Sequence, residues 1–235
     1  MNLKHQNQQT TRQQPTIQRS TLAPVVKASY AFHRADDQFD SAVTYSCFKD
    51  RTSMVPQRIT ESFQELAMRC RTPESRSRND GPTFSPFTFS LLHDGYNARE
   101  CNFLSFKFEK MWAFTQSEDI LACVDGLASF VYSTHSHTVK PRPTGSYQLI
   151  VALSTPIPEE YYKVVAMNFA TRFSRLRGII NSSYMSPDQR LQFPSCPISR
   201  QRFFSMEAQC GRSFDWSPDF TENQAPKAHQ SWGMQ

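Results

Sequence analysis

Two short apolar runs constrain the fold of this chain more than any other feature. Phe103-Leu-Ser-Phe-Lys-Phe108 and Tyr147-Gln-Leu-Ile-Val-Ala-Leu153 are rich in aromatic and branched residues, the residues that favour strands. Each run has the length of a typical strand. The sequence therefore predicts a domain built around a sheet in which these two segments are buried.

Strand-like and helix-like segments alternate around these runs. We expect strands at Val43–Phe48 and Ser129–Ser133, with short late strands at Leu191–Phe193 and Arg202–Phe204. The segment from Arg71 to Pro86, punctuated by Pro, Ser and Asp80-Gly81-Pro82, predicts a loop.

Three segments carry helix-start signals. A helix is expected from Thr60 or Ser62, because Ser62 and Glu65 have the capping-box spacing. Thr115-Gln-Ser-Glu118 has the same spacing and predicts a second helix. Pro156 and Pro158 lie where a third can begin, since the first turn of a helix does not need their missing N–H groups.

These elements follow a β-α-β-β-α-β order, which predicts an α+β fold with a sheet covered on one side. Residues 1–40 are basic, rich in Gln and without apolar periodicity. Such a segment buries too little apolar surface to offset its ordering entropy, so we expect a disordered arm. The predicted organisation is this arm, one domain over residues 41–220, and a flexible tail over 221–235.

Composition excludes several protein classes. No run of about 18 apolar residues is present, so no membrane-spanning helix is expected. The start of the chain lacks the apolar core of a secretory signal, which predicts a cytoplasmic protein without a membrane partner. The six cysteines are widely scattered, and free thiols are expected.

Arginines gather late in a chain whose net charge is +5 and whose sequence pI is about 8.9. Two interpretations stay open, contact with nucleic-acid phosphates and ordinary solvated surface. Late aromatic residues, which interleave with Arg190, Arg200 and Arg202, are compatible either with base stacking or with core packing. The arginines are Arg172, Arg175, Arg177, Arg190, Arg200, Arg202 and Arg212, and the aromatic residues are Phe193, Phe203, Phe204, Phe214 and Trp216.

Ser133-Thr-His-Ser-His137 is the most pointed local motif, because it follows directly on a predicted strand. In an extended chain Ser133, His135 and His137 would project to one face. A phosphate site, a metal-binding pair and a packed, hydrogen-bonded surface are all compatible with this pattern.

The segments around this motif resemble the archaeo-eukaryotic primase-polymerase superfamily, in particular the domains of plasmid, phage and mobile-element replication proteins. The resemblance rests on Phe130–Thr138, Gln148–Tyr161 and Ser186–Pro197 in their order, and it covers roughly Val43 to Phe220. It implies an RRM-like catalytic core with an additional N-terminal strand and helix unit. It also implies nucleotidyl transfer by two divalent cations held by carboxylates.

Carried over by position, the family's motifs match unevenly. Ser133-Thr134-His135 keeps the small-x-His motif, so Ser133, Thr134, His135 and the following His137 are candidate nucleotide-binding residues. Among the acids Glu109 is kept, as a candidate catalytic and metal-binding residue beside His135. The positions of the other two acids carry Lys107 and Asn181. The expected basic residue on the next strand is Gln148.

Other acids would have to act if this registration were shifted. Asp188 lies near Asn181 but fits the register less well. Ordinary loop and cap positions are the simpler interpretation of the further acids Asp94 and Asp125, and Glu100 and Asp119 are also open.

The resemblance therefore predicts a replication-associated protein of a mobile genetic element that binds DNA, with nucleotide as a further candidate ligand and with reduced or lost primer synthesis. Mg²⁺ or Mn²⁺ would be the cofactor of an active form, and a separate replicative helicase is a candidate partner. Candidate DNA-binding residues are Arg172, Arg175, Arg190, Arg200 and Arg202. Two alternatives remain, an active two-metal primase or polymerase and a non-catalytic module that binds DNA or a helicase.

Overall fold

The computed structural model describes residues 41–77, 79–94, 96–111, 116–135, 145–172 and 186–216. The expected arm and tail, and the candidate residues His137, Arg175 and Asn181, lie outside these ranges. Of the helices in the described ranges the longest has 14 residues, and none is long and apolar enough to cross a bilayer.

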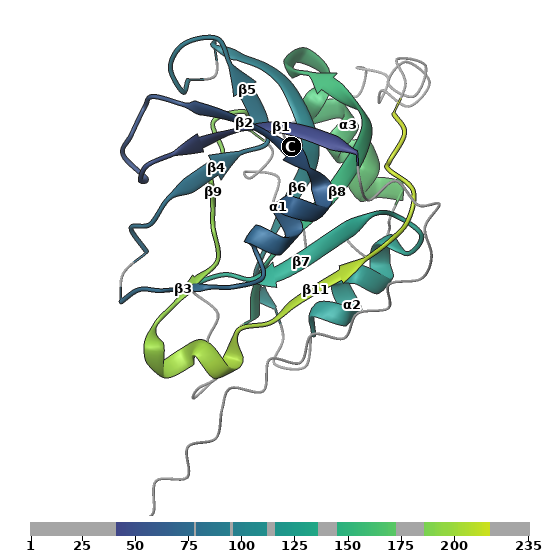
Figure 1. Ribbon diagram of the computed structural model, residues 1–235. Helices are drawn as coiled ribbons and strands as arrows, with labels where there is room; N and C mark the ends of the chain where they lie inside the picture. Colours follow the sequence, from purple (N-terminus) through teal and green to yellow (C-terminus); the bar gives the residue numbers. More distant parts are fainter. Residues whose placement is uncertain are drawn as a thin grey trace, which may run out of the picture.

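The larger of two main sheets has five antiparallel strands in the order β11-β7-β8-β6-β5 (Figure 1). Its centre consists of two long strands, β6 and β8, which contain the two apolar runs and pair with each other. Both buried-strand predictions and the prediction of β7 are therefore confirmed. The strands are β5 (Phe87–Phe89), β6 (Ala98–Met111), β7 (Ser129–Ser133), β8 (Gly145–Pro158) and β11 (Met206–Gln209).

A second sheet of four strands has the order β2-β1-β4-β9. Its strand β1 confirms the expected strand near Val43, and β9 the first of the two late strands. The strands are β1 (Ala42–Phe48), β2 (Gln57–Ser62), β4 (Thr83–Ser85) and β9 (Leu191–Gln192), and a small parallel pair joins β3 (Glu74–Ser75) to β10 (Ser195–Cys196).

The helices begin close to where their caps predict. Helix α1 (Phe63–Arg69) has Ser62 as its N-cap, and the capping box with Glu65 is present. Helix α2 (Ser117–Leu121) begins one residue later than expected, because the Asp119 carboxylate accepts from the backbone N–H of Gln116 at 2.8 Å. Helix α3 (Glu159–Arg172) follows directly on Pro158.

Three expectations were wrong. The segment from Arg71 to Pro86 contains β3 and β4, whose partners lie far away in the sequence. Arg202–Phe204 is not a strand, because a 3₁₀ helix runs from Ile198 to Phe203. The five-stranded sheet is also covered on both faces rather than on one, because α1 and the second sheet pack on the side opposite α2 and α3.

Two buried clusters hold these layers together. Phe106 and Phe108 of β6 face α2 and α3, and Phe106 stacks on Phe169 of α3 with 5.2 Å between ring centroids. On the opposite face Phe103 and Phe130 pack against α1 and the second sheet. In Figure 1, α1 lies in front of β6 and β8. The alternation of side chains along a strand places successive β6 residues on opposite faces.

Candidate functional site

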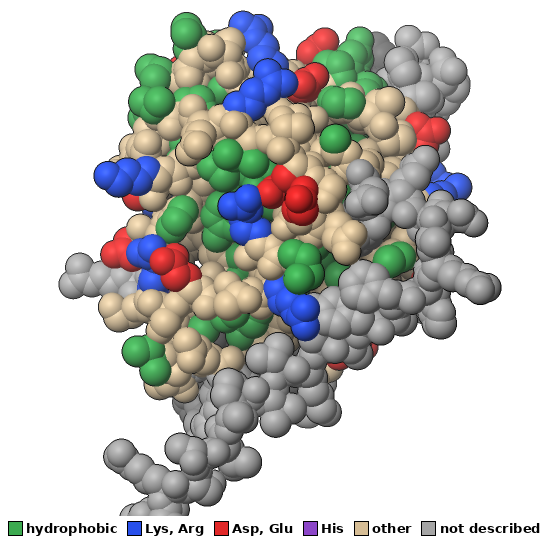
Figure 2. Space-filling model, in the orientation of Figure 1, with side chains coloured by type: hydrophobic (Ala, Val, Ile, Leu, Met, Phe, Trp, Pro, Cys, Tyr) green, Lys and Arg blue, Asp and Glu red, His purple; other side chains and the backbone are tan. Residues whose placement is uncertain are grey.

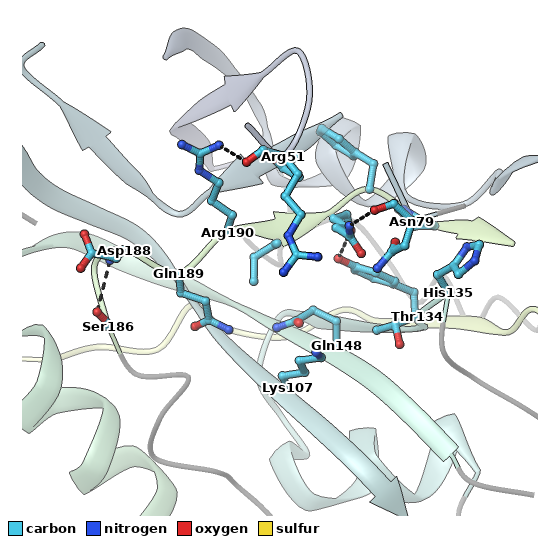
Figure 3. Close-up of a pocket in the computed structure, with 16 residues that line it drawn as sticks. Arg51, Asn79, Lys107, Thr134, His135, Gln148, Ser186, Asp188, Gln189 and Arg190 are labelled. Atoms are coloured by element: carbon cyan, nitrogen blue, oxygen red, sulfur yellow. Dashed lines mark hydrogen bonds between the residues drawn. The ribbon is translucent and has the colours of Figure 1, made fainter. Parts of the chain in front are cut away.

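A cavity of about 540 Å³ lies between the two main sheets (Figure 3). Its floor is formed by strands of the five-stranded sheet, and its walls by β4, the loop after β1 and the segment 186–194. The volume is in the range of small-molecule sites. Polar groups from remote parts of the chain meet here, which is the usual arrangement of a binding site.

The floor is a row of three side chains from adjacent strands. Lys107 of β6 pairs with Gln148 of β8, and Gln148 pairs with Tyr132 of β7. Directly opposite residues in neighbouring strands have Cβ atoms about 5 Å apart, so the three side chains lie side by side. The Tyr132 hydroxyl donates to the carbonyl oxygen of Gln192 at 2.9 Å, and burial raises the pKa of this phenol, which therefore stays protonated. Tyr132 thus fixes β9 against the floor.

Lys107 forms an ion pair with Glu109, with 2.5 Å between Nζ and Oε1. The two residues are two apart on β6, so they share a face. Lys107 lines the cavity, whereas Glu109 lies outside its lining, on the exposed part of the strand. Within the described part of the chain no three His, Cys, Asp or Glu side chains are grouped so that they could hold a metal ion.

The three residues of the small-x-His motif have different environments. The Ser133 hydroxyl accepts from the backbone N–H of Ser205 at 3.0 Å, and this buried side chain does not line the cavity. Thr134 and His135 do line it. Thr134 Oγ1 donates to Ser146 Oγ at 2.7 Å.

His135 is held by a hydrogen bond between Nδ1 and Ser195 Oγ, 3.2 Å apart. The strand alternation that would place Ser133 and His135 on one face does not apply, because β7 ends at Ser133. The cavity therefore brings together Lys107, Thr134 and His135 of the candidate residues, and leaves out Ser133 and Glu109.

Of the candidate arginines, Arg190 lies at the cavity wall. Its guanidinium carbon is 4.3 Å from the centroid of the Phe48 ring, and Nη1 donates to the carbonyl oxygen of Arg51 at 2.8 Å. Desolvation lowers the pKa of Arg190. These contacts anchor the segment after Ser186 to the loop after β1.

The other described arginines lie elsewhere. Arg172 is the exposed last residue of α3 and does not line the cavity, and the side chains of Arg200 and Arg202 are outside the description. On the face drawn in Figure 2, basic and acidic side chains are interspersed rather than gathered in one basic patch.

Two of the alternative acids, Asp94 and Asp119, have structural roles. Asp94 accepts hydrogen bonds from Asn97 at 2.8 Å or less, and Asp119 caps α2. Neither these nor Glu100 and Asp125 line the cavity. Asp188 does line it, at the exposed end (Figure 3).

The late aromatic residues belong to the core where the structure describes their side chains. Phe193 packs on Phe84 with ring centroids 4.5 Å apart, and Phe214 on Phe169 at 4.9 Å. Trp216 is buried, and its Nε1 donates to the carbonyl oxygen of Thr155 at 2.9 Å. Core packing is therefore the interpretation that these contacts favour.

Sequence reasoning missed three residues of the cavity wall, Arg51, Asn79 and Gln189. Each lies in a loop, and although Gln189 falls within Ser186–Pro197, no pattern singles out these three residues, so the packing of remote segments identifies them. In Figure 3 the side chain of Arg51 extends toward the middle of the cavity, above Gln148.

No protein-family model and no curated protein matches the chain. Among solved structures, it is similar to the AEP domain of the primase-polymerase of cyanophage S-2L, with 10% sequence identity and a TM-score of 0.42 over 79% of this chain and 89% of that one. It is also similar to the polymerase domain of Mycobacterium tuberculosis Ligase D, solved in complex with DNA. In that comparison the identity is 17% and the TM-score 0.35, over 68% of this chain and 59% of that one.

Proposed function

We propose that the chain is a primase-polymerase-like domain that binds DNA and nucleotide but synthesises little or no primer. The observation that carries this proposal is the position of Lys107 on the floor of the cavity, beside Gln148 and within reach of the segment that carries Thr134 and His135. In the family that the sequence resembles, this strand position supplies an acid. The resemblance and the cavity thus point to the same location.

The residues of the cavity do not fit a pair of divalent cations. Mg²⁺ and Mn²⁺ are held by carboxylate oxygens, whereas Lys107 brings an ammonium into contact with Glu109, the acid that the motif keeps. Replacing a carboxylate by a lysine changes the local charge by two units. Among the described residues that line the cavity there are three further basic or titratable cationic side chains, Arg51, His135 and Arg190, and one carboxylate, Asp188. An anion is therefore the ligand that its charge favours.

The resemblance to replication proteins also supports a wider proposal. Residues 41–220 would form one domain between a basic arm and a tail, acting in the replication of a mobile genetic element. DNA would be its macromolecular ligand, and a separate replicative helicase its protein partner.

Primer synthesis on a single-stranded template tests the proposal. With Mg²⁺ or Mn²⁺ present, we expect no product above that of a reaction without the chain, together with salt-dependent binding of the template. Robust synthesis by the unmodified chain that disappears in Glu109→Ala would show an active enzyme instead. An active enzyme would also require that residues outside the described ranges complete its metal site.

The remaining alternative is a module that binds DNA or a helicase without binding nucleotide. DNA binding that is unaffected by nucleotide, with no direct nucleotide binding, would favour it. A chain that binds no DNA even at low salt would contradict both this alternative and our proposal.

A further inference from the structure

Arg51 presents a guanidinium to the cavity. Its backbone is fixed by Arg190, which donates to the Arg51 carbonyl oxygen, while its side chain points inward (Figure 3). Among the described residues the Arg51 side chain makes no hydrogen bond and no ion pair. A guanidinium that points into a cavity and has no partner there is suited to binding an anion.

Two buried amide groups of the same cavity also lack partners. Gln148 is 3% exposed and its Nε2 makes no hydrogen bond, and Oε1 of Gln189 is buried without one. Both residues line the cavity. Buried polar groups are almost always hydrogen-bonded because leaving them unpaired is costly. Both groups belong to residues that line the cavity, so a small rotation of either side chain would turn a donor of the floor or an acceptor of the wall toward a ligand.

Lys107 supplies charge at the point where the floor meets Glu109. An ammonium has three N–H donors, so Lys107 can contact the Glu109 carboxylate and a phosphate together. Carboxylate, cation and phosphate would then alternate in space, which is the charge order that a divalent cation produces between acids and a nucleotide.

The two amides narrow the choice of ligand. Phosphate oxygens at neutral pH accept hydrogen bonds, which satisfies Nε2 of Gln148 but not Oε1 of Gln189. A ligand that serves both must also carry an O–H or N–H donor. A nucleotide has such donors on its sugar and its base, whereas fully ionised inorganic polyphosphate has none.

We propose that Arg51, Lys107 and Gln148 bind the phosphates of a nucleotide without a divalent cation, with Lys107 in place of the cation and Gln189 accepting from the sugar or base. This inference rests on the proposed nucleotide binding and goes beyond it, because it makes recognition independent of metal. It assigns Arg51, Gln148 and Gln189 to the site as contact residues.

Isothermal titration of the full chain with ATP, in EDTA and in Mg²⁺, tests the inference. We expect the two affinities to agree within about threefold. Arg51→Ala and Lys107→Ala should each weaken ATP binding in EDTA by roughly tenfold to a hundredfold, as loss of a hydrogen bond to a charged group does. Gln189→Ala should weaken binding of ATP but not of tripolyphosphate.

Matched controls separate the site from general loss of charge. Arg58 on β2 and Lys163 on α3 are exposed and lie outside the cavity, so Arg58→Ala and Lys163→Ala should leave ATP affinity unchanged. Thermal melting followed by circular dichroism checks that each variant is folded. Lys107→Asp, which places a carboxylate beside Glu109, should abolish ATP binding in EDTA and restore part of it with Mn²⁺.

Three outcomes would overturn the inference. ATP binding only in Mg²⁺ would do so, and so would ATP binding in EDTA that survives both Arg51→Ala and Lys107→Ala in folded protein. The third is binding of a single-stranded oligonucleotide, but not of ATP, in the cavity. This result would assign the phosphate contacts of the cavity to a DNA strand. In each case, retained binding of the single-stranded template would still support the proposed DNA binding. Loss of both ATP binding and template binding would contradict the proposed function as well.

Discussion

The two faces of the five-stranded sheet differ in what fills them. On one face Phe106 and Phe108 are almost completely buried against α2 and α3. On the other face, apolar side chains of one part of the sheet pack against α1 and the second sheet. In the remaining part, Lys107 and Gln148 form the floor of a cavity. Because neighbours on a strand point to opposite faces, a single strand, β6, contributes to the core on one face and to the floor of the cavity on the other.

The largest expected effect compares adjacent residues of β6. Phe106→Ala removes a ring stacked on Phe169 and should lower the free energy of unfolding by about 3–5 kcal/mol. Lys107→Ala, one position along, should change it by less than about 1 kcal/mol. Urea denaturation measures both. Equal destabilisation by the two variants would show that the faces are not separated as described.

A smaller effect tests the boundary between packing and cavity. Tyr132→Phe removes the hydroxyl that donates to the carbonyl oxygen of Gln192 and leaves that acceptor unpaired. We expect a loss of about 1–3 kcal/mol in the free energy of unfolding. Tyr96 is 98% exposed, so Tyr96→Phe is the control and should have no measurable effect. An unchanged stability in Tyr132→Phe would mean that β9 is not fixed by this bond.

Glu109→Gln is a variant for which the direction of the change in ATP affinity is the informative result. The ion pair between Glu109 and Lys107 is partly exposed, so its removal should cost little stability and make Lys107 more available to phosphate. We expect ATP affinity in EDTA to rise by about two- to fivefold. Glu61→Gln, at the acid that pairs with Arg69 of α1, should leave ATP affinity unchanged. A fall in the ATP affinity measured with Mn²⁺, or a loss of Mn²⁺-dependent activity, in Glu109→Gln would instead identify Glu109 as a metal ligand.

The smallest expected effect is a pH dependence at His93, a buried histidine near Arg190. His93 is buried between the rings of Phe48 and Phe89, and its Nε2 makes no hydrogen bond. Desolvation lowers the pKa of His93, and the nearby positive charge of Arg190 lowers it further. The carboxylates of Asp188 and Asp94 act in the opposite direction and raise this pKa.

A histidine whose pKa is lower in the folded than in the unfolded chain contributes stability at pH values above its ordinary pKa of about 6.5. This contribution is lost as the pH falls through the lower pKa of the folded chain. Thermal melting between neutral and mildly acidic pH should therefore show a decrease that is smaller in His93→Phe. An identical pH dependence in the two proteins would contradict this assignment.

Local patterns in the sequence predicted the parts of the fold that local patterns determine. The apolar runs of β6 and β8, the strand β7 and the Ser62 capping box follow from side-chain type and spacing. Strand β4 could not be predicted in this way, because its three residues become a strand only through pairing with β1 and β9.

The candidate site was predictable only where its residues occupy positions of a local sequence motif. Lys107, Thr134 and His135 follow a motif, and the structure brings them to one cavity. Arg51 follows no motif, since its place there depends on contacts such as that of Arg190 with the Arg51 carbonyl oxygen, 139 residues apart in sequence. Ser133 matches the motif, but it is the last residue of β7 and its hydroxyl accepts a hydrogen bond from the backbone N–H of Ser205.

The most direct test of the account is a crystal structure of the chain with a non-hydrolysable ATP analogue and Mn²⁺, with anomalous data to locate the metal. The account predicts phosphates in contact with Arg51, Lys107 and Nε2 of Gln148, a sugar or base donor at Oε1 of Gln189, and no anomalous peak beside Glu109. A Mn²⁺ ion bound to Glu109 between the protein and the phosphates would contradict it, as would an analogue bound outside the cavity.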